Sequence, residues 1–80
     1  MQTTTKRKPF MRRPKWISQG EWVAGLVVMV QARYGWTLGR VATVAGVDRS
    51  ALHRLVRHHN GIGPARLERL RRWAVNVLRA

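Results

Sequence analysis

The sequence predicts an all-α fold, a compact bundle of four to five helices preceded by a flexible basic N-terminal arm. Apolar residues recur at helical spacing in four segments, and the residues that flank these segments are typical helix caps. No segment shows the alternation of apolar and polar residues that a half-buried strand requires. Eighty residues make one small domain, and a hydrophobic content of 45% excludes a fully disordered polycation.

The first helix is predicted to begin after Ser18, because Ser18 and Glu21 form a capping box that satisfies two unpaired N–H groups. The apolar residues that then recur at helical spacing are Trp22, Leu26, Met29 and Val30. Gly35 is the predicted end, since glycine readily adopts the left-handed conformation of a helix C-cap. The opposite face is also apolar through Ala24 and Val28, so we expect this helix to be covered on two sides.

Two short helices are predicted next. Thr37 is the N-cap of the first and Gly46 its end, and the apolar positions between them follow the spacing i, i+3, i+4 and i+7. These positions are Leu38, Val41, Ala42 and Ala45. Asp48 caps the second short helix, where its carboxylate also suits the positive end of the helix dipole. We expect Asn60 and Gly61 to close that helix, because both tolerate a left-handed conformation.

The fourth helix is predicted to begin at Pro64, because the missing N–H of proline costs nothing in the first turn. One apolar stripe follows, through Leu67, Leu70, Ala74, Val77 and Leu78. Glu68 is placed to pair with Arg72 at i+4. The tryptophans are interpreted as core and interface residues rather than as base-stacking platforms; they are Trp16, Trp22, Trp36 and Trp73.

The two short helices have the pattern of a helix-turn-helix. A turn of three or four residues at Gly46 and Val47 requires the helices to pack at a steep angle. The small side chain of Ala42 lets them approach each other, and Val47, Leu52 and Leu55 fill the angle between them. The predicted bundle therefore contains a helix-turn-helix, with its second short helix in the recognition position.

The second short helix divides into two faces when it is projected at about 100° per residue. The apolar arc consists of Ala51, Leu52, Leu55, Val56 and His59. The opposite arc includes no acid and consists of Arg49, Ser50, His53, Arg54 and Arg57. Arginine can donate a bidentate pair of hydrogen bonds to guanine, so this arc suits a base-contacting surface. A solvated basic helix face is the alternative interpretation.

The composition indicates a polyanionic partner. Sixteen Lys and Arg residues outnumber three acids and give a net charge of +13, so we expect contacts with nucleic-acid phosphates. The absence of Cys excludes disulfides and thiolate chemistry. The longest apolar run, Trp22 to Val30, is shorter than the ~20 residues that span a bilayer. We therefore expect no membrane partner, and the basic charge leads us to expect a cytoplasmic, nucleoid-associated protein. A basic amphipathic membrane-surface binder would explain the charge but not the turn pattern.

Residues 1–15 are predicted to form a flexible basic arm in front of the helix-turn-helix domain, residues 16–80. This segment has six cations and no acid, and Pro9 and Pro14 interrupt it, so it buries too little surface to fold. The residues expected to contact DNA phosphates are Lys6, Arg7, Lys8, Arg12 and Arg13. A solubilising tail is the alternative interpretation.

From about Leu26 to Leu78 the chain resembles the lambda-repressor-like (Cro/XRE) DNA-binding domains, in the stretches QARYGWTLGRVATVAGVDRSALHRLV and NGIGPARLERLRRWA. The resemblance implies that helix 49–58 enters the major groove of DNA. The base-contacting residues that it implies are Arg49, Ser50, His53 and Arg54. The phosphate-contacting residues that it implies are Thr37, Arg40, Arg57, Asn60 and Gly61. Leu38 and Gly39 stand where the family often has Gln, and the last helix is one long segment rather than two short ones.

Together these features predict a sequence-specific transcriptional regulator that binds double-stranded DNA, a repressor of the phage or mobile-element type. A low-specificity accessory protein that binds RNA or DNA is the alternative. We expect a homodimer, because members of the resembled family pair on DNA and because Ala24, Val28 and Trp73 add apolar surface beyond the needs of one small core.

No enzymatic activity, cofactor, metal site or small-molecule substrate is predicted. The run from His58 to Asn60 has no Cys and almost no carboxylate beside it to complete a metal site. The segment Gly61–Gly63 lacks the Lys and the Ser or Thr of a P-loop. No Ser, His and acid have a spacing that supports a catalytic triad.

Overall fold

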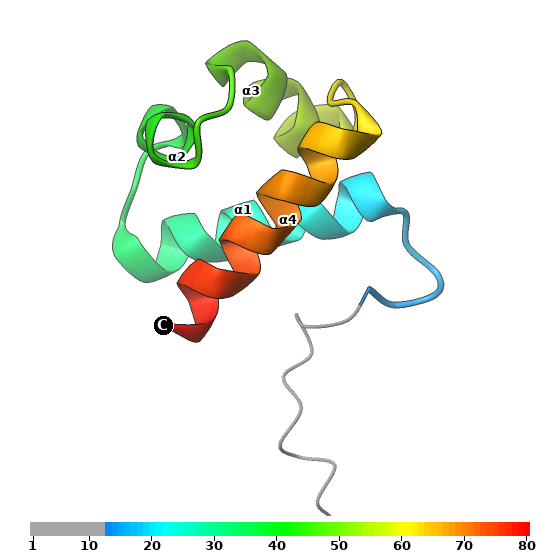
Figure 1. Cartoon of the computed structure of the whole chain (residues 1–80), viewed down its shortest axis with the longest axis horizontal. Helices are drawn as coiled ribbons and strands as arrows, with labels where there is room; N and C mark the ends of the chain where they lie inside the picture. Colours follow the sequence, from blue (N-terminus) through cyan, green and yellow to red (C-terminus); the bar gives the residue numbers. More distant parts are fainter. Residues whose placement is uncertain (1–12) are drawn as a thin grey trace, which may run out of the picture.

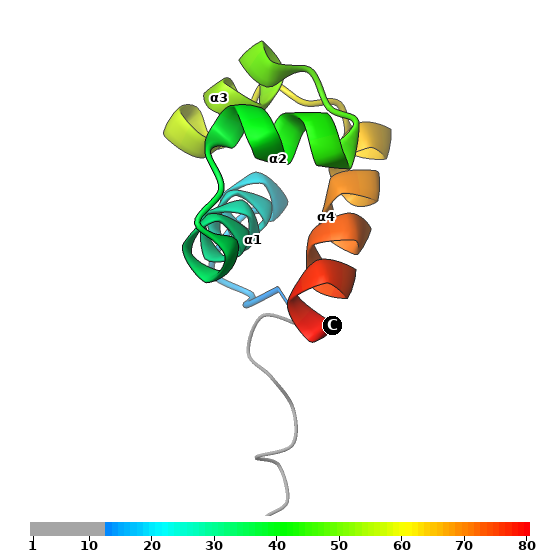
Figure 2. The same ribbon diagram turned by 90° about the vertical axis from the view of Figure 1, so that its left-hand side faces the viewer.

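The computed structural model describes residues 13–80, and this part of the chain contains four α-helices and no strand. The helices are α1 (Gln19–Tyr34), α2 (Leu38–Ala45), α3 (Arg49–His58) and α4 (Pro64–Arg79). Helices α2 and α3 lie together on one side of α1, and α4 crosses α1 and packs along it (Figures 1 and 2). The predicted all-α class is confirmed for the described residues.

Three of the four helices begin at a predicted N-cap whose side chain accepts a backbone hydrogen bond. The bonds run from Glu21 N to Ser18 Oγ at 3.1 Å, from Arg40 N to Thr37 Oγ1 at 3.1 Å and from Ala51 N to Asp48 Oδ2 at 3.0 Å. Each bond satisfies an N–H that has no partner inside the helix. Gly35 and Gly46 end α1 and α2 with φ of 68° and 74°, as their predicted C-cap roles require.

The end of α3 differs from the prediction. His59 ends the helix in a left-handed conformation, with φ of 62°, where Asn60 and Gly61 were expected to close it. The N–H of His59 donates to the carbonyl of Leu55 at 2.8 Å. The start of α1 approaches so closely here that a Cβ on Gly20 would lie 2.2 Å from the His59 carbonyl oxygen. The chain therefore turns where α3 meets the backbone of α1.

The core draws apolar side chains from all four helices. Its largest fully buried side chains are those of Val23, Leu26, Val27, Val30, Val41, Leu52, Leu55 and Leu70. Because α2, α3 and α4 all contact α1, the buried arc of α1 is wide and only a narrow outer arc stays exposed.

Two predictions for α1 and one for the tryptophans are therefore corrected. Ala24, expected on a second outer face, is 3% exposed because it lies inside the wide buried arc. Met29, expected in the inner stripe, is 42% exposed because it lies on the outer arc. Trp22 is buried, whereas Trp16 precedes the first helix and is 84% exposed, so it is not a core residue.

Polar contacts fasten α4 to α1 at both ends. The Arg33 guanidinium donates to the carbonyls of Leu78 and Ala80, and the Tyr34 hydroxyl donates to that of Val77 at 3.1 Å. The Arg33 bonds satisfy two carbonyls at the end of the chain that have no later N–H to pair with, and the Tyr34 hydroxyl is a second donor to the Val77 carbonyl, which also accepts from Ala80 N at 3.3 Å.

At the other end, Glu68 accepts hydrogen bonds from Arg71, with Nε at 2.9 Å, and from Gln19 at 3.3 Å. Arg72 Nε lies 3.4 Å from the same carboxylate, so the predicted i+4 pair is present. The Arg71 hydrogen bonds lower the pKa of Glu68 to about 2 against the opposing effect of desolvation, with further lowering from the Arg71 charge, Gln19 and Arg72.

Candidate nucleic-acid interface

The outer face of α3 consists of polar side chains exposed to solvent. These residues are Arg49, Ser50, His53, Arg54, Arg57 and His58. On the inner face, Leu52 and Leu55 are fully buried against the core. The predicted division of α3 into a buried and an exposed face is confirmed, except that His59, expected on the apolar arc, is exposed because it lies beyond the last helical turn. A well-packed helix thus holds a row of hydrogen-bond donors away from the core.

One end of this face meets the first turn of α2. The Arg49 side chain lies over Gly39, with its Nε 3.8 Å from the position that a Cβ on Gly39 would take. Thr37 and Arg40 are exposed at the same helix end, and the Arg40 guanidinium lies 5.5 Å from the ring centre of Trp36. The N-terminus of a helix carries a partial positive charge. The Arg49 guanidinium and the Thr37 hydroxyl therefore lie together at the N-terminus of α2, a combination that suits an anionic oxygen.

The other end of the face meets the loop after α3. A Cβ on Gly61 would lie 2.9 Å from Nε and 3.0 Å from Cβ of Arg54, so the side chain of Arg54 rests directly on the glycine. Gly61 has φ of 97°, which disfavours any other residue. Asn60 and Gly61 are both exposed. The loop residues expected to contact phosphates therefore lie beside the outer face of α3.

Two shallow hollows lie between these ends. One, of about 350 Å³, is lined by Leu38, Arg49, Ser50 and His53. The next, of about 370 Å³, is lined by Ser50, His53, Arg54, Arg57 and His58. Ser50 and His53 border both hollows and form the centre of the face. All four predicted base-contacting residues thus lie on one continuous surface.

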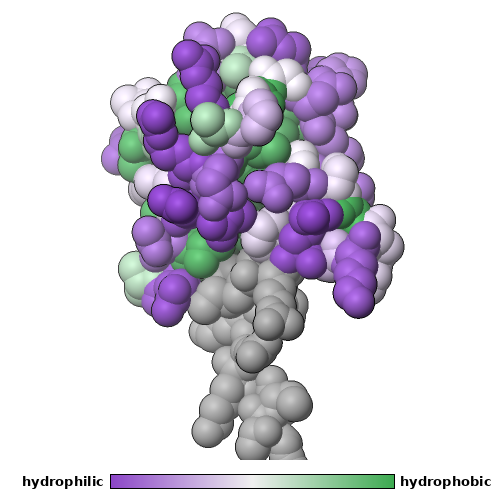
Figure 3. Space-filling view, turned by 45° about the vertical axis from the view of Figure 1, so that its right-hand side comes forward, coloured by the Kyte–Doolittle hydropathy of each residue, from purple (hydrophilic) through white to green (hydrophobic). Residues whose placement is uncertain are grey.

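The face has a positive charge that no acid on α3 offsets, because α3 contains neither Asp nor Glu. The Asp48 carboxylate is engaged at the N-cap of α3, and Glu68 is engaged by Arg71 and Arg72 on α4. Figure 3 shows that hydrophilic residues cover much of the surface on another side of the molecule, with smaller hydrophobic areas between them. The charge that the sequence predicts for this helix therefore remains available to an external anion.

The structure does not bring every predicted contact residue to this face. The described segment that precedes α1 lies on the other side of α1 from α3 (Figures 1 and 2), and within it Arg13 donates to the carbonyl of Ile17 at 2.9 Å. The other predicted arm contacts, Lys6, Arg7, Lys8 and Arg12, lie outside the described residues.

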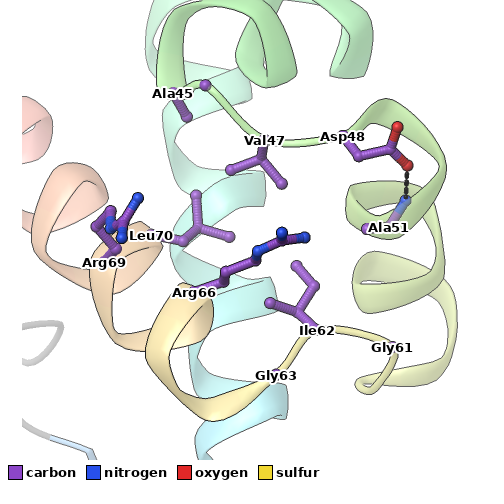
Figure 4. Close-up of a pocket in the computed structure, with 11 residues that line it drawn as sticks. Ala45, Val47, Asp48, Ala51, Gly61, Ile62, Gly63, Arg66, Arg69 and Leu70 are labelled. Carbon is purple, nitrogen blue, oxygen red and sulfur yellow. Dashed lines mark hydrogen bonds between the residues drawn. The ribbon is translucent and has the colours of Figure 1, made fainter.

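A third hollow, of about 380 Å³, lies between the turn after α2, the loop before α4 and α4 itself (Figure 4). Val47, Ile62 and Leu70 converge there, and Arg66 extends across the hollow toward α3. Val47 and Ile62 pack against the core that includes Leu70, so they fasten the turn after α2 and the loop before α4 to that core.

Sequence reasoning missed two contacts that shape the interface. The packing of Arg49 on Gly39 joins residues of different helices. Apart from the small size of glycine, nothing in the sequence predicts this contact. The contact of Arg40 with Trp36 left no helical signal either, because Trp36 precedes the N-cap of α2 and the i,i+4 spacing applies only within a helix.

Within residues 13–80 no group of three or more His, Asp or Glu side chains is placed to hold a metal ion. None of the four described helices is both long enough and apolar enough to cross a membrane. Comparisons of the chain with protein-family models, curated proteins and solved structures give no match.

Proposed function

We propose that the chain is a sequence-specific regulator that binds double-stranded DNA by inserting α3 into the major groove. The observation that carries this proposal is the exposed face of α3, which combines arginines, a serine and histidines with no acid on a helix whose other face is fully buried. The major groove of B-DNA, about 12 Å wide, admits an α-helix, and donors on that helix meet the acceptors of guanine and adenine. In this proposal α2 and α3 form a helix-turn-helix.

The position of each residue suggests its role. The base-contacting residues are Arg49, Ser50, His53 and Arg54, which border the two hollows along α3. The phosphate-contacting residues lie at the edges of that surface and are Thr37, Arg40, Arg57, Asn60 and Gly61. Phosphate contacts on both sides fix the register of the helix in the groove, while base contacts select the sequence.

The regulator is proposed to repress transcription by occupying its operator, in the manner of a phage or mobile-element repressor. The resemblance of residues from about Leu26 to Leu78 to the lambda-repressor-like domains supports this role. A low-specificity accessory protein is the second candidate. It is favoured by the exposed arginines that α4 adds to those of α3: Arg66, Arg69, Arg72 and Arg79.

Two alanine variants separate the candidates. Arg49→Ala removes a guanidinium from the outer face of α3, and Arg69→Ala removes another exposed guanidinium from α4. We expect Arg49→Ala to cost ~1–3 kcal/mol on the preferred duplex and much less on random duplexes. We expect Arg69→Ala to weaken binding to both duplexes slightly and equally, through the loss of one phosphate attraction.

The measurement is fluorescence anisotropy on both duplexes at one fixed salt concentration, with circular dichroism to confirm that both variants are folded. If Arg49→Ala lowers the affinity for preferred and random duplexes by the same factor, the face binds phosphates without selecting a sequence. That result would support the accessory protein and contradict the regulator.

A further inference from the structure

The outer arc of α1 carries an exposed stripe without polar side chains. Its residues follow the spacing i, i+3, i+4 and i+7, and they are Gly25, Val28, Met29 and Ala32. Val28 is 48% exposed and Met29 is 42% exposed. This spacing is that of a helix face which packs against another helix. We call these four residues the α1 stripe.

A hollow of about 460 Å³ borders the stripe at Gly25. It is lined almost wholly by apolar residues, namely Pro14, Ile17, Trp22, Gly25, Leu26 and Met29, together with Glu21. A Cβ placed on Gly25 would have no described atom within 4 Å. A helix laid on the stripe can therefore approach closely at Gly25 and insert a side chain there.

Charge indicates which helix can lie there. The chain carries +13, so two copies repel each other over most of their surfaces. The α1 stripe contains no cation, and the exposed residues at its two ends have opposite charges, Glu21 near the N-terminus of α1 and Arg33 near the C-terminus. Antiparallel pairing brings the acidic end of each α1 beside the basic end of the other. It also aligns the two helix dipoles favourably.

We infer that the α1 stripe is the surface through which two copies of this chain form an antiparallel homodimer. In this dimer Met29 of each copy enters the hollow over Gly25 of the other, as a knob enters a hole. Placing these two residues opposite each other puts the two-fold axis beside Val28. The same contact is made twice, as a two-fold interface requires.

This surface revises the one predicted from the sequence. Val28 stays in the interface, but Ala24 is buried in the core of its own chain, and Trp73 is half-buried against that core. Met29 and Gly25 take their place. The α1 stripe lies opposite the buried arc through which α1 contacts α3, so the dimer leaves the outer face of α3 accessible. The inference does not depend on DNA binding and is tested without DNA.

The primary test compares Val28→Glu with Val44→Glu in the full chain. Val44 is the matched control, because it is 45% exposed but lies on α2. Sedimentation velocity is measured without DNA at about 1 to about 100 µM chain. We expect the wild type and Val44→Glu to be dimers. We expect Val28→Glu to raise the dimer Kd at least about 100-fold, because each dimer would bury two unpaired carboxylates.

A monomeric wild type over this range would mean that something other than a second copy covers the stripe, and it would overturn the inference. Equal dimerisation of the two glutamate variants would overturn it as well.

A cysteine variant keeps the inference testable if Val28→Glu fails to fold. The sequence has no Cys, so any disulfide in a single-cysteine variant joins two copies. Val28→Cys places the two sulfurs near the two-fold axis, and we expect mild oxidation to convert most of it to a covalent dimer. Val44→Cys is expected to remain reduced and monomeric on a non-reducing gel. Equal cross-linking of the two variants would contradict the proposed axis.

Discussion

Replacing Gly20 with Ala tests the contact that sets the position of α3. Gly20 is the second residue of α1, and a Cβ there would lie 2.2 Å from the carbonyl oxygen of His59 and 3.1 Å from its carbonyl carbon. Real Cβ contacts stay beyond 3.0 Å, so the end of α3 or the start of α1 would have to move by at least about 0.8 Å. Because both partners are backbone atoms, no side-chain rotation can relieve the clash.

The matched control is Gly39→Ala. Gly39 is likewise the second residue of a helix that follows a hydroxyl N-cap, but a Cβ there meets its nearest atom, Arg49 Nε, at an ordinary 3.8 Å. Both substitutions improve helix propensity by up to about 1 kcal/mol, so the difference between the variants isolates the clash. Overpacking of this kind costs ~1–3 kcal/mol.

Thermal unfolding followed by circular dichroism provides the measurement. In a domain of this size 1 kcal/mol shifts the Tm by roughly 4–8 °C, so Gly20→Ala is expected to melt at least about 4 °C below Gly39→Ala. We also expect Gly20→Ala to lower DNA affinity, since it displaces the end of α3 beside the loop at Gly61. Equal stability of the two variants would refute the close approach of α1 and α3, and with it the placement of the recognition face.

Two further predictions concern the core and the ion pairs of α4. Leu52→Ala is expected to lower the free energy of unfolding by ~2–5 kcal/mol, because Leu52 is fully buried. Urea unfolding measures this free energy. A decrease below about 1 kcal/mol would show that α3 is loosely packed. Glu68 has a pKa lowered from its ordinary 4.5 to about 2, chiefly by hydrogen bonds from Arg71, so its carboxylate stabilises the fold above pH 4.5 and this contribution is lost as the pH falls toward 2. Glu68→Gln should therefore lower the Tm at pH 7, and the Tm of this variant should decrease less than that of the wild type between pH 4.5 and 2. If the Tm of both proteins decreases equally over this pH range, the ion pair with Arg71 contributes nothing to stability.

The helix boundaries could be predicted closely because local interactions determine them. Ser18, Thr37 and Asp48 each cap the helix that follows through a bond to an N–H three residues away. Gly35 and Gly46 end helices through their own backbone freedom. The predicted start of the helix at Arg49 coincides with that of α3 for the same reason, whereas the residue that closes this helix, His59, was not predicted.

The features that sequence reasoning missed depend on contacts between distant segments. The helical pattern cannot show that three helices cover α1, and so it placed Met29 inside and Ala24 outside. His59 ends α3 because Gly20, far away in the sequence, lets α1 pass close to it. The exposed face of α3 could be predicted because helical periodicity alone separates its arginines from its leucines. The packing of Arg49 on Gly39 could not, since it depends on the angle between α2 and α3.

Selection of bound duplexes from a random DNA pool by the full chain tests the central claim most directly. If α3 contacts base edges, one motif is enriched, and its duplex binds at least ~10³-fold more tightly than random competitor at the same salt concentration. Ser50→Ala and His53→Ala, at the centre of the face, should then change the enriched motif rather than merely weaken binding. A pool that is retained through its charge but shows no enriched motif would contradict sequence-specific recognition by this helix.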